Sequence, residues 1–356
     1  MDYREIMSGR KRGVPAGLLR AALGAGSLAY GLGVRHRNRR FDRDPQAVID
    51  CGVPVISVGN LTTGGTGKTP IVAALARQIR DAGYRVALVS RGYGRGDADQ
   101  NDEADELYAR LPDVPHLQDP DRVAAAKIAV DELEAEVILM DDGFQHRRLH
   151  RDLDIVVIDA TCPFGYGHLL PRGLLREPVT GIRRADLVIL SRCGQVNADT
   201  VDAIQQRLAE VDGRIGDQIP LITSDHQPSR LINDADPNRP IRDLENRRIA
   251  TLCAIGNPDS FESTVRQCGA TMVDSFRLPD HDRYEPDTVQ RIRQWIGGLD
   301  GRVDEVVCTH KDLVKLKTSR LGGLPLSAVQ VDWVVLSGEA ALKKAVQSVI
   351  ERPKDF

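Results

Sequence analysis

The sequence predicts an α/β protein: a mostly parallel sheet with helices on both faces, followed by a smaller C-terminal α/β domain. From Val53 onward, short runs of Val, Ile and Leu alternate with helical stretches, which is the pattern of parallel strands buried on both faces. The chain has 356 residues, more than one hydrophobic core normally supports. We therefore expect two domains.

The expected organisation has four segments: a basic N-terminal helix at 1–40, a core domain at 41–225, a linker at 226–247 and the smaller domain at 248–356. The linker is predicted because its residues are polar and rich in Pro and Asn. Expected strands of the core domain are 53–58, 85–90, 137–140, 154–158, 187–190 and 221–223, and its expected helices are 68–82, 120–133 and 198–211. The smaller domain begins with strand 249–255 and helix 259–268, and further elements are expected at 271–276, 286–296, 305–308, 328–335 and 339–351.

The first expected strand runs into a glycine-rich turn and then a helix, VPVISVGNLTTGGTGKTP. Because Gly64, Gly65 and Gly67 lack a Cβ atom, successive backbone N–H groups can turn inward around phosphate oxygens. Lys68 would reach the β- and γ-phosphates of ATP, and the Thr69 hydroxyl would ligate Mg²⁺. The pattern therefore indicates a cradle for a nucleoside triphosphate.

This loop departs from the strict phosphate-loop pattern at one position. Thr62 stands five residues before Gly67, where glycine is usual, so the match is to GGTGKT with Thr66 between the glycines. An ordinary glycine-rich turn is the alternative, and the strand before the loop and the helix after it argue against that. We expect a P-loop NTPase-like core domain, with ATP and Mg²⁺ as cofactors.

Two adjacent carboxylates, Asp141 and Asp142, follow the expected strand 137–140. Ligands of parallel α/β sheets bind beyond the carboxyl ends of the strands, where P-loop enzymes hold Mg²⁺ or its waters. Because neighbouring carboxylates repel each other without a cation, the pair favours a metal site. An acidic turn that only reverses the chain is the alternative.

Two loops of the core domain could also carry chemistry. Asp102 and Glu103 lie in an acidic, irregular run at 97–106, where a carboxylate could be the general base for a substrate hydroxyl. On the residues alone, a solvated acidic loop is the favoured interpretation. In LLPRGLLREP, the guanidinium groups of Arg172 and Arg176 could bind phosphate, or they could form a surface salt bridge with Glu177.

In the second domain, PDHDRY at 279–284 places His281 between Asp280 and Asp282. A histidine beside carboxylates can act as a base, orient another group or bind a metal. Judged from these residues alone, a catalytic role for this histidine is less favoured than a non-catalytic one.

The first 40 residues carry a net charge of +7, from eight Arg and Lys11 against Asp2 and Glu5, whereas the whole chain carries −3. Residues 13–34 are apolar except for Arg20, and their longest uncharged run has 14 residues, too few to span roughly 30 Å of hydrocarbon. Apolar side chains recur at helical spacing, so we expect a helix lying in the membrane plane with its arginines on anionic headgroups. Docking of this helix on its own protein is the alternative.

The composition argues against several classes of protein. The six cysteines are scattered without a C-x-x-C pair, which argues against a zinc site or a disulfide framework and favours a reducing compartment. No aromatic platform accompanies the arginines, so nucleic-acid binding is not expected. We infer no obligate protein partner.

With these residues assembled, the chain resembles the tetraacyldisaccharide 4′-kinase family, the lipid A 4′-kinases of the Gram-negative envelope. The resemblance runs from the N-terminal helix to about Leu316 and rests on an ordered series of motifs. They are PVISVGNLTTGGTGKTP, SRGYG, DDGFQHR, LLPRGLLREP, AIGNPDSF, PDHDRY and THKDLVKL. The resemblance implies transfer of the ATP γ-phosphate to the 4′-hydroxyl of a tetraacylated glucosamine disaccharide 1-phosphate, at the cytoplasmic face of the inner membrane.

The resemblance also implies roles for individual residues. Asp102 would match the carboxylate that activates the 4′-hydroxyl, partnered by His281 from the other domain. Asp141 and Asp142 would match the metal-binding pair. Closure of the second domain over the first would complete the site and exclude water.

The loop at Arg176 and Glu177 would match one near the nucleotide and the metal, with the arginine on the nucleotide and the carboxylate on the metal. The family also carries threonine at the position of Thr62.

Three departures from the family motifs are visible. Asp282 stands where a second histidine is usual, and His310 replaces the Glu of a TEKD motif. The usual GDEP reads Asn-Asp-Glu-Ala at 101–104, which leaves 105–106 as a competing register for the base. A membrane-associated P-loop ATPase that acts as a switch or assembly factor is the alternative function, and it would hydrolyse ATP slowly without lipid.

Overall fold

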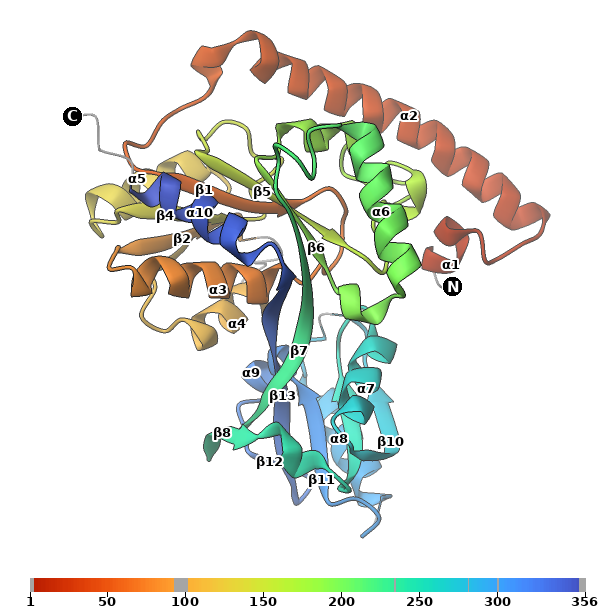
Figure 1. The fold of residues 1–356 in the computed structure, drawn as a ribbon. Coiled ribbons are helices and arrows are strands. Elements are labelled where there is room, and N and C mark those ends of the chain that lie inside the picture. Colours follow the sequence, from red (N-terminus) through yellow and green to blue (C-terminus); the bar gives the residue numbers. More distant parts are fainter. Residues whose placement is uncertain (1–2, 93–101, 234, 281, 300, 352–356) are drawn as a thin grey trace. The chain divides into compact units, whose positions relative to one another are not determined.

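The computed structural model describes residues 3–92, 102–233, 235–280, 282–299 and 301–351, and its elements are labelled in Figure 1. The chain forms two compact units. Unit 1 contains Met1–Tyr93, Asp113–Asp225 and Val334–Phe356, and unit 2 contains Gly94–Pro112 and His226–Trp333. The chain leaves unit 1 along strand β7 (Leu221–Asn233) and returns along β13 (Leu324–Ser337).

The strands that unit 1 contributes are parallel, and the five in the middle of their order are buried along their whole length. Their order is β7, β6 (Leu187–Ser191), β5 (Leu153–Asp159), β1 (Val55–Asn60), β4 (Val137–Asp141), β2 (Val86–Ser90) and β3 (His116–Gln118). Each neighbouring pair is in parallel register. Strands of this kind are apolar on both faces, which is why runs of Val, Ile and Leu identified them in the sequence.

Helices cover both faces of this sheet. Helices α5 (Arg122–Asp131) and α6 (Ala198–Val211) pack on the face that carries Met140 and Val156. Helices α3 (Lys68–Asp81) and α10 (Glu339–Ile350) cover the other face (Figure 1). The arrangement confirms the predicted parallel sheet with helices on both sides.

The N-terminus of unit 1 consists of the short helix α1 (Tyr3–Ser8) and the long helix α2 (Val14–Arg43). Four short 3₁₀ turns complete the described part of unit 1: η1 (Pro45–Ala47), η2 (Gly165–Gly167), η3 (Val179–Arg184) and η4 (Cys193–Gln195).

Unit 2 has its own parallel strands, in the order β10 (Thr271–Arg277), β9 (Arg248–Cys253), β11 (Glu305–Thr309) and β13. Its helices are α4 (Asp102–Arg110), α7 (Pro258–Gln267), α8 (Pro286–Gly297) and α9 (His310–Leu316). The short strand β8 (Asp236–Pro240) pairs antiparallel with β7, followed by the turn η5 (Ile241–Leu244), and β12 (Arg320–Leu321) pairs antiparallel with β13.

The structure differs from the sequence-based organisation in three places. The acidic run expected to be irregular forms helix α4 from Asp102 onward, and this helix belongs to unit 2. Most of the expected linker is β7, β8 and η5, because β7 continues ten residues beyond the predicted strand 221–223. Helix α10, expected in the C-terminal domain, belongs to unit 1.

Candidate active site

The loop between β1 and α3 in unit 1 has the backbone shape of a phosphate cradle. Gly64 has φ 103° and Gly67 has φ 78°, values that side-chain-bearing residues rarely adopt. A Cβ atom added to Gly64 or Gly65 would meet nothing within 4 Å, so the space beside these glycines is open. Asn60 Nδ2 donates to Thr66 Oγ1 at 3.1 Å and ties the end of β1 to the loop. Helix α3 then begins at Lys68, so its N-terminus faces this loop.

Three charged side chains converge beside this loop. Lys68 Nζ lies 3.5 Å from Asp142 Oδ1. Arg176 Nη1 donates to both carboxylate oxygens of Asp142, at 2.8 Å and 2.7 Å. Burial raises the pKa of Asp142, but Lys68 and Arg176 outweigh this effect and bring the pKa down to about 2. Asp142 is therefore an anion that holds two cations next to the cradle.

Glu177 supports Arg176 through Gln145. Gln145 Nε2 donates to Glu177 Oε1 at 2.9 Å and to the Asn60 carbonyl at 2.8 Å, while its Oε1 accepts from Arg176 Nη1 at 3.2 Å. The other oxygen of Glu177 accepts from Arg184 at 2.8 Å, and the Glu177 side chain is buried. Both oxygens of this predicted metal ligand thus already bind protein donors.

The position of Thr62 is explained by the loop at 169–178 that carries Arg172 and Arg176, called the arginine loop below. Thr62 forms an antiparallel bridge with Leu175, and it is buried. On either side of it, Thr63 N donates to Leu174 O and Arg176 N donates to Leu61 O, both at 2.8 Å. The start of the cradle is thus paired with the arginine loop by backbone hydrogen bonds.

Asp141 ends β4 and lies in register with Val58 of β1, two residues before β1 ends. Together with Asp142 and the Thr69 hydroxyl it offers oxygen donors only. Over the described part of the chain, no group of three or more His, Cys, Asp and Glu side chains could hold a metal ion. This donor set fits Mg²⁺, which nucleotide sites bind through one or two carboxylates plus phosphate oxygens.

The predicted acceptor-side residues belong to unit 2. Asp102 is the first residue of α4, and only its backbone is described; His281 lies outside the described residues. The rest of α4 is held by buried charges: Arg110 Nε donates to Glu106 Oε1 at 3.1 Å, and its Nη2 donates to Val331 O at 3.1 Å. Burial raises the pKa of Glu106, but Arg110 opposes it and the net shift is downward.

The loop after β10 is fixed at Tyr284. This buried residue has φ 56°, and its hydroxyl donates to Asp312 Oδ1 at 2.7 Å. The second oxygen of Asp312 accepts from Thr309 Oγ1 at 2.6 Å. Burial, together with the Asp312 charge, raises the pKa of Tyr284 far above its ordinary value. The loop that contains His281 in the sequence is thereby attached to the start of α9.

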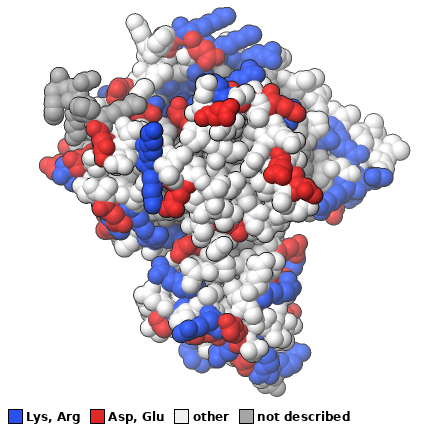
Figure 2. Space-filling view, viewed as in Figure 1, with Lys and Arg blue, Asp and Glu red and all other residues white. Residues whose placement is uncertain are grey.

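Helix α2 docks on the arginine loop by one narrow face. Ser27 Oγ donates to Leu169 O at 2.8 Å, and the Tyr30 hydroxyl donates to Arg176 O at 3.0 Å. The opposite face exposes Val14, Leu18, Leu28 and Leu32. Figure 2 shows Lys and Arg gathered near both ends of α2.

By length and composition α2 could span a membrane, contrary to the predicted length limit, and only 6% of its most apolar window is buried.

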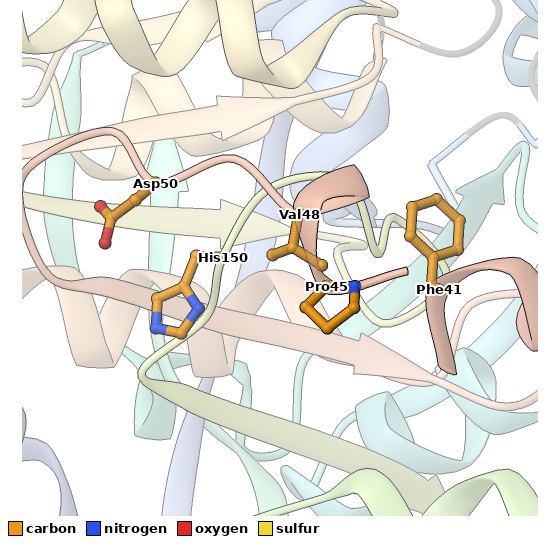
Figure 3. Close-up of a pocket in the computed structure, with 5 residues that line it drawn as sticks. All are labelled: Phe41, Pro45, Val48, Asp50 and His150. Carbon is orange, nitrogen blue, oxygen red and sulfur yellow. The ribbon is translucent and has the colours of Figure 1, made fainter. Parts of the chain in front are cut away.

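A hollow of about 380 Å³ lies at the C-terminal end of α2 (Figure 3). Its lining residues are Phe41, Pro45, Val48, Asp50 and His150, and no predicted site residue is among them. We assign no function to it.

Several residues that contact Asp142, Arg176 or Glu177 were not predicted from the sequence. Gln145 stands in the DDGFQHR motif but received no role, and Arg184 lies in a turn that no motif marks. Arg122 was also missed; its Nη2 donates to the Asp142 carbonyl at 3.3 Å. The sequence carried no signal for Arg122, because its burial and its place after the N-cap of α5 are visible only in the structure.

A parallel sheet, an open glycine loop and a lysine at the start of the following helix define a P-loop nucleotide-binding protein. The arginine and carboxylates beside the loop are typical of phosphoryl transfer. A family profile described as tetraacyldisaccharide-1-P 4′-kinase matches residues 19–352. The chain belongs to the tetraacyldisaccharide 4′-kinase family.

Curated relatives and a solved structure agree with this assignment. The chain is 36% identical over 345 residues to a tetraacyldisaccharide 4′-kinase of Anaeromyxobacter sp. strain Fw109-5, covering 91% of each chain. A Geobacter sulfurreducens relative with the same name is 36% identical over 366 residues, which cover 97% of this chain and 98% of that one. The crystal structure of LpxK from Aquifex aeolicus in complex with ATP superposes with a TM-score of 0.71 at 29% identity, covering 93% of this chain and 99% of that chain.

These findings confirm the predicted fold and activity. The protein is an ATP-dependent kinase of lipid A synthesis that phosphorylates the 4′-hydroxyl of a tetraacyldisaccharide 1-phosphate, with ATP and Mg²⁺ as cofactors. The ATPase switch is not favoured.

Proposed function

We propose that the cradle and the Lys68–Asp142–Arg176 cluster bind the triphosphate of ATP, and that Asp102 with His281 activates the lipid hydroxyl. The convergence of Lys68 and Arg176 on one carboxylate beside an open glycine loop carries this proposal. Two cations held next to a phosphate cradle can neutralise the charge that develops on the transferring group. The full nucleotide-binding set is Thr62, Gly64, Gly65, Thr66, Gly67, Lys68, Thr69 and Arg176.

Mg²⁺ is assigned to Thr69, Asp141 and Asp142. When bound, the ion would neutralise charge on the β- and γ-phosphate oxygens. Glu177 is assigned to the ion as well; its oxygens accept hydrogen bonds from Gln145 and Arg184, as both oxygens of Asp142 accept from Arg176. The low pKa of Asp142, about 2, keeps it anionic at physiological pH.

Asp102 is assigned as the general base, with His281 as its partner. The 4′-oxygen attacks the γ-phosphorus as its proton passes to the carboxylate, and the bond from the γ-phosphorus to the bridging oxygen of ADP breaks. The competing register places the base at Asp105 or Glu106. The ion pair of Glu106 with buried Arg110 argues against that residue as the base.

We assign α2 as an in-plane membrane helix of the cytoplasmic face of the inner membrane. Its docked face, with Ser27 and Tyr30, binds the arginine loop, so the helix cannot be surrounded by lipid while docked. Its exposed apolar face then meets the acyl region, and the arginines near its ends meet anionic headgroups.

The acceptor-side assignment is tested by phosphoryl transfer with γ-labelled ATP and a 1-phosphorylated tetraacyl-disaccharide. We expect Asp102→Ala and His281→Ala to lower kcat by about 10²- to 10⁴-fold, the range of general-base catalysis. The control is Asp287→Ala at the exposed start of α8. A kcat for Asp102→Ala within a few-fold of wild type across pH would reject this base.

The membrane assignment is tested by flotation with vesicles that contain anionic lipid. A Leu18→Glu/Leu32→Glu variant should stay unbound because its exposed apolar face is interrupted. The matched control is Ile128→Glu, an exposed apolar residue of α5. Equal flotation of both variants would reject the proposed surface.

A further inference from the structure

The end of strand β6 contacts the cradle from outside. Ser191 Oγ donates to the Thr66 carbonyl at 3.1 Å, and Arg192 Nη2 donates to the Gly65 carbonyl at 2.9 Å. Ser191 is completely buried, and the Arg192 side chain is about one-fifth exposed. Neither residue belongs to a motif that gave the nucleotide site. They nevertheless bind two successive carbonyl groups of the phosphate loop.

These two hydrogen bonds set the direction of the loop N–H groups. In a trans peptide unit the C=O of one residue points opposite to the N–H of the next. Fixing the carbonyls of Gly65 and Thr66 toward β6 therefore turns the N–H groups of Thr66 and Gly67 the other way. A phosphate cradle needs N–H groups that point inward together.

Arg192 is itself held in place by Asp159, the last residue of β5. One oxygen of Asp159 forms an ion pair with Arg192 Nη1. The other accepts from the backbone N of Thr161 at 2.9 Å and from its hydroxyl at 2.6 Å, so the carboxylate cannot easily rotate away. Arg192 has φ 58°, a conformation that costs a non-glycine residue free energy and is kept where the surroundings require it.

We propose that Asp159 and Arg192 form a positioning pair that orients the cradle before ATP binds. Neither is a catalytic residue, because Arg192 binds a carbonyl of the loop and Asp159 binds Arg192. The proposal rests on the assignment of the cradle to ATP. Preorganisation of this kind removes an ordering cost from binding, so its loss should weaken ATP affinity.

Two variants distinguish positioning from simple attraction of phosphate by charge. Arg192→Ala removes both the hydrogen bond and a positive charge, so both explanations predict weaker ATP binding. Asp159→Asn leaves the charge of Arg192 in place but weakens the contact that holds it. Positioning predicts weaker binding for this variant, whereas charge alone predicts equal or tighter binding because a negative group is removed.

The experiment is calorimetric titration of the full-length protein with ATP and Mg²⁺. We expect the Kd of each single variant to rise about tenfold, and that of the double variant to rise no more than that of Arg192→Ala, since the residues act as a unit. The KM for ATP should rise in parallel, while kcat at saturating ATP and the KM for the lipid acceptor change less than about threefold. Arg207→Ala, an exposed arginine of α6, is the matched control.

A Kd for Asp159→Asn within twofold of wild type, or additive effects in the double variant, would overturn the proposal. Circular dichroism of the unliganded protein shows whether each variant folds. If Arg192→Ala does not fold, Asp159→Asn alone tests the positioning pair. Lys68→Ala separates this outcome from failure of the cradle assignment. Unchanged ATP binding in Lys68→Ala rejects the cradle itself, whereas its loss together with unchanged binding in Asp159→Asn rejects only the positioning pair.

Discussion

The two units hold their functional segments by different means. In unit 1 the phosphate loop is bound through its backbone. Ser191 and Arg192 donate hydrogen bonds to its carbonyl oxygens, and the arginine loop forms backbone hydrogen bonds with its first residues. In unit 2, helix α4 and the loop at Tyr284 are held by buried side chains, Arg110 and Asp312. The cradle thus contributes mainly backbone groups to the contacts that hold it, whereas the held segments of unit 2 contribute their own buried polar side chains, Arg110 and Tyr284. The two should therefore respond differently to truncation and to pH.

The largest effect is expected in unit 1. Lys68→Ala should lower kcat by about 10³-fold, because it removes a cation that stabilises the transition state. Folding stability should change little, since the loop is held through its backbone. Steady-state kinetics and thermal melting measure the two quantities, with Lys127→Ala on the exposed face of α5 as the control. A large loss of stability would show that the cradle also depends on its side chains.

In unit 2, Arg110→Ala should reduce the free energy of unfolding by about 3–5 kcal/mol, since it leaves buried Glu106 without its cation. Denaturant titration measures this value, and Arg293→Ala on the exposed face of α8 is the matched control. A change as small as that of the control would mean that the pair does not support α4.

His310 should control how the folding stability of unit 2 changes with pH. Burial, opposed by Glu106 and aided by Arg110, lowers its pKa to about 4. The unfolded chain binds this proton near pH 6.5 and the folded chain only near 4, so stability falls as the pH drops between these values. His310→Gln should reduce the loss between pH 7 and 5 by about 2 kcal/mol, measured by denaturant titration. The exposed His36→Gln is the control, and an equal loss in all three proteins would contradict the expectation.

The smallest effect is expected for Asp312→Asn. The amide can still bind one of the hydroxyls of Tyr284 and Thr309, so the unfolding free energy should fall by about 1 kcal/mol. Thermal melting measures it, with Asp287→Asn as the control. No difference between the two variants would remove Asp312 from the contacts that hold unit 2 together.

The parts predicted from the sequence are those with local signals. Strands β4 and β6 were placed within one residue because buried parallel strands are continuously apolar, and the cradle was found from its glycines. The missed parts depend on distant partners. Asp142 and Arg176 are 34 residues apart, and Asp159 and Arg192 are 33 apart. The acidic run at 97–106 suggested a solvated loop, although Glu106 and Arg110 stand at the spacing of a helical ion pair and α4 begins at Asp102.

The segment assignments of 226–247 and α10 failed for a related reason. A polar composition identified the first as a linker, but β7 and β8 pair with each other and need no apolar run to do so. The apolar face of α10 fits any sheet, and nothing within the helix says which one it covers. Tertiary contacts decide such cases.

The division of roles between the units is tested most directly by measuring both the ATP affinity and the kcat of Asp102→Ala. We expect the Kd for ATP to stay within twofold of wild type while kcat falls at least a hundredfold, because the nucleotide is bound by unit 1 and this carboxylate acts on the acceptor. A rise in the Kd for ATP that matches the loss of kcat, or a kcat close to wild type, would contradict this account.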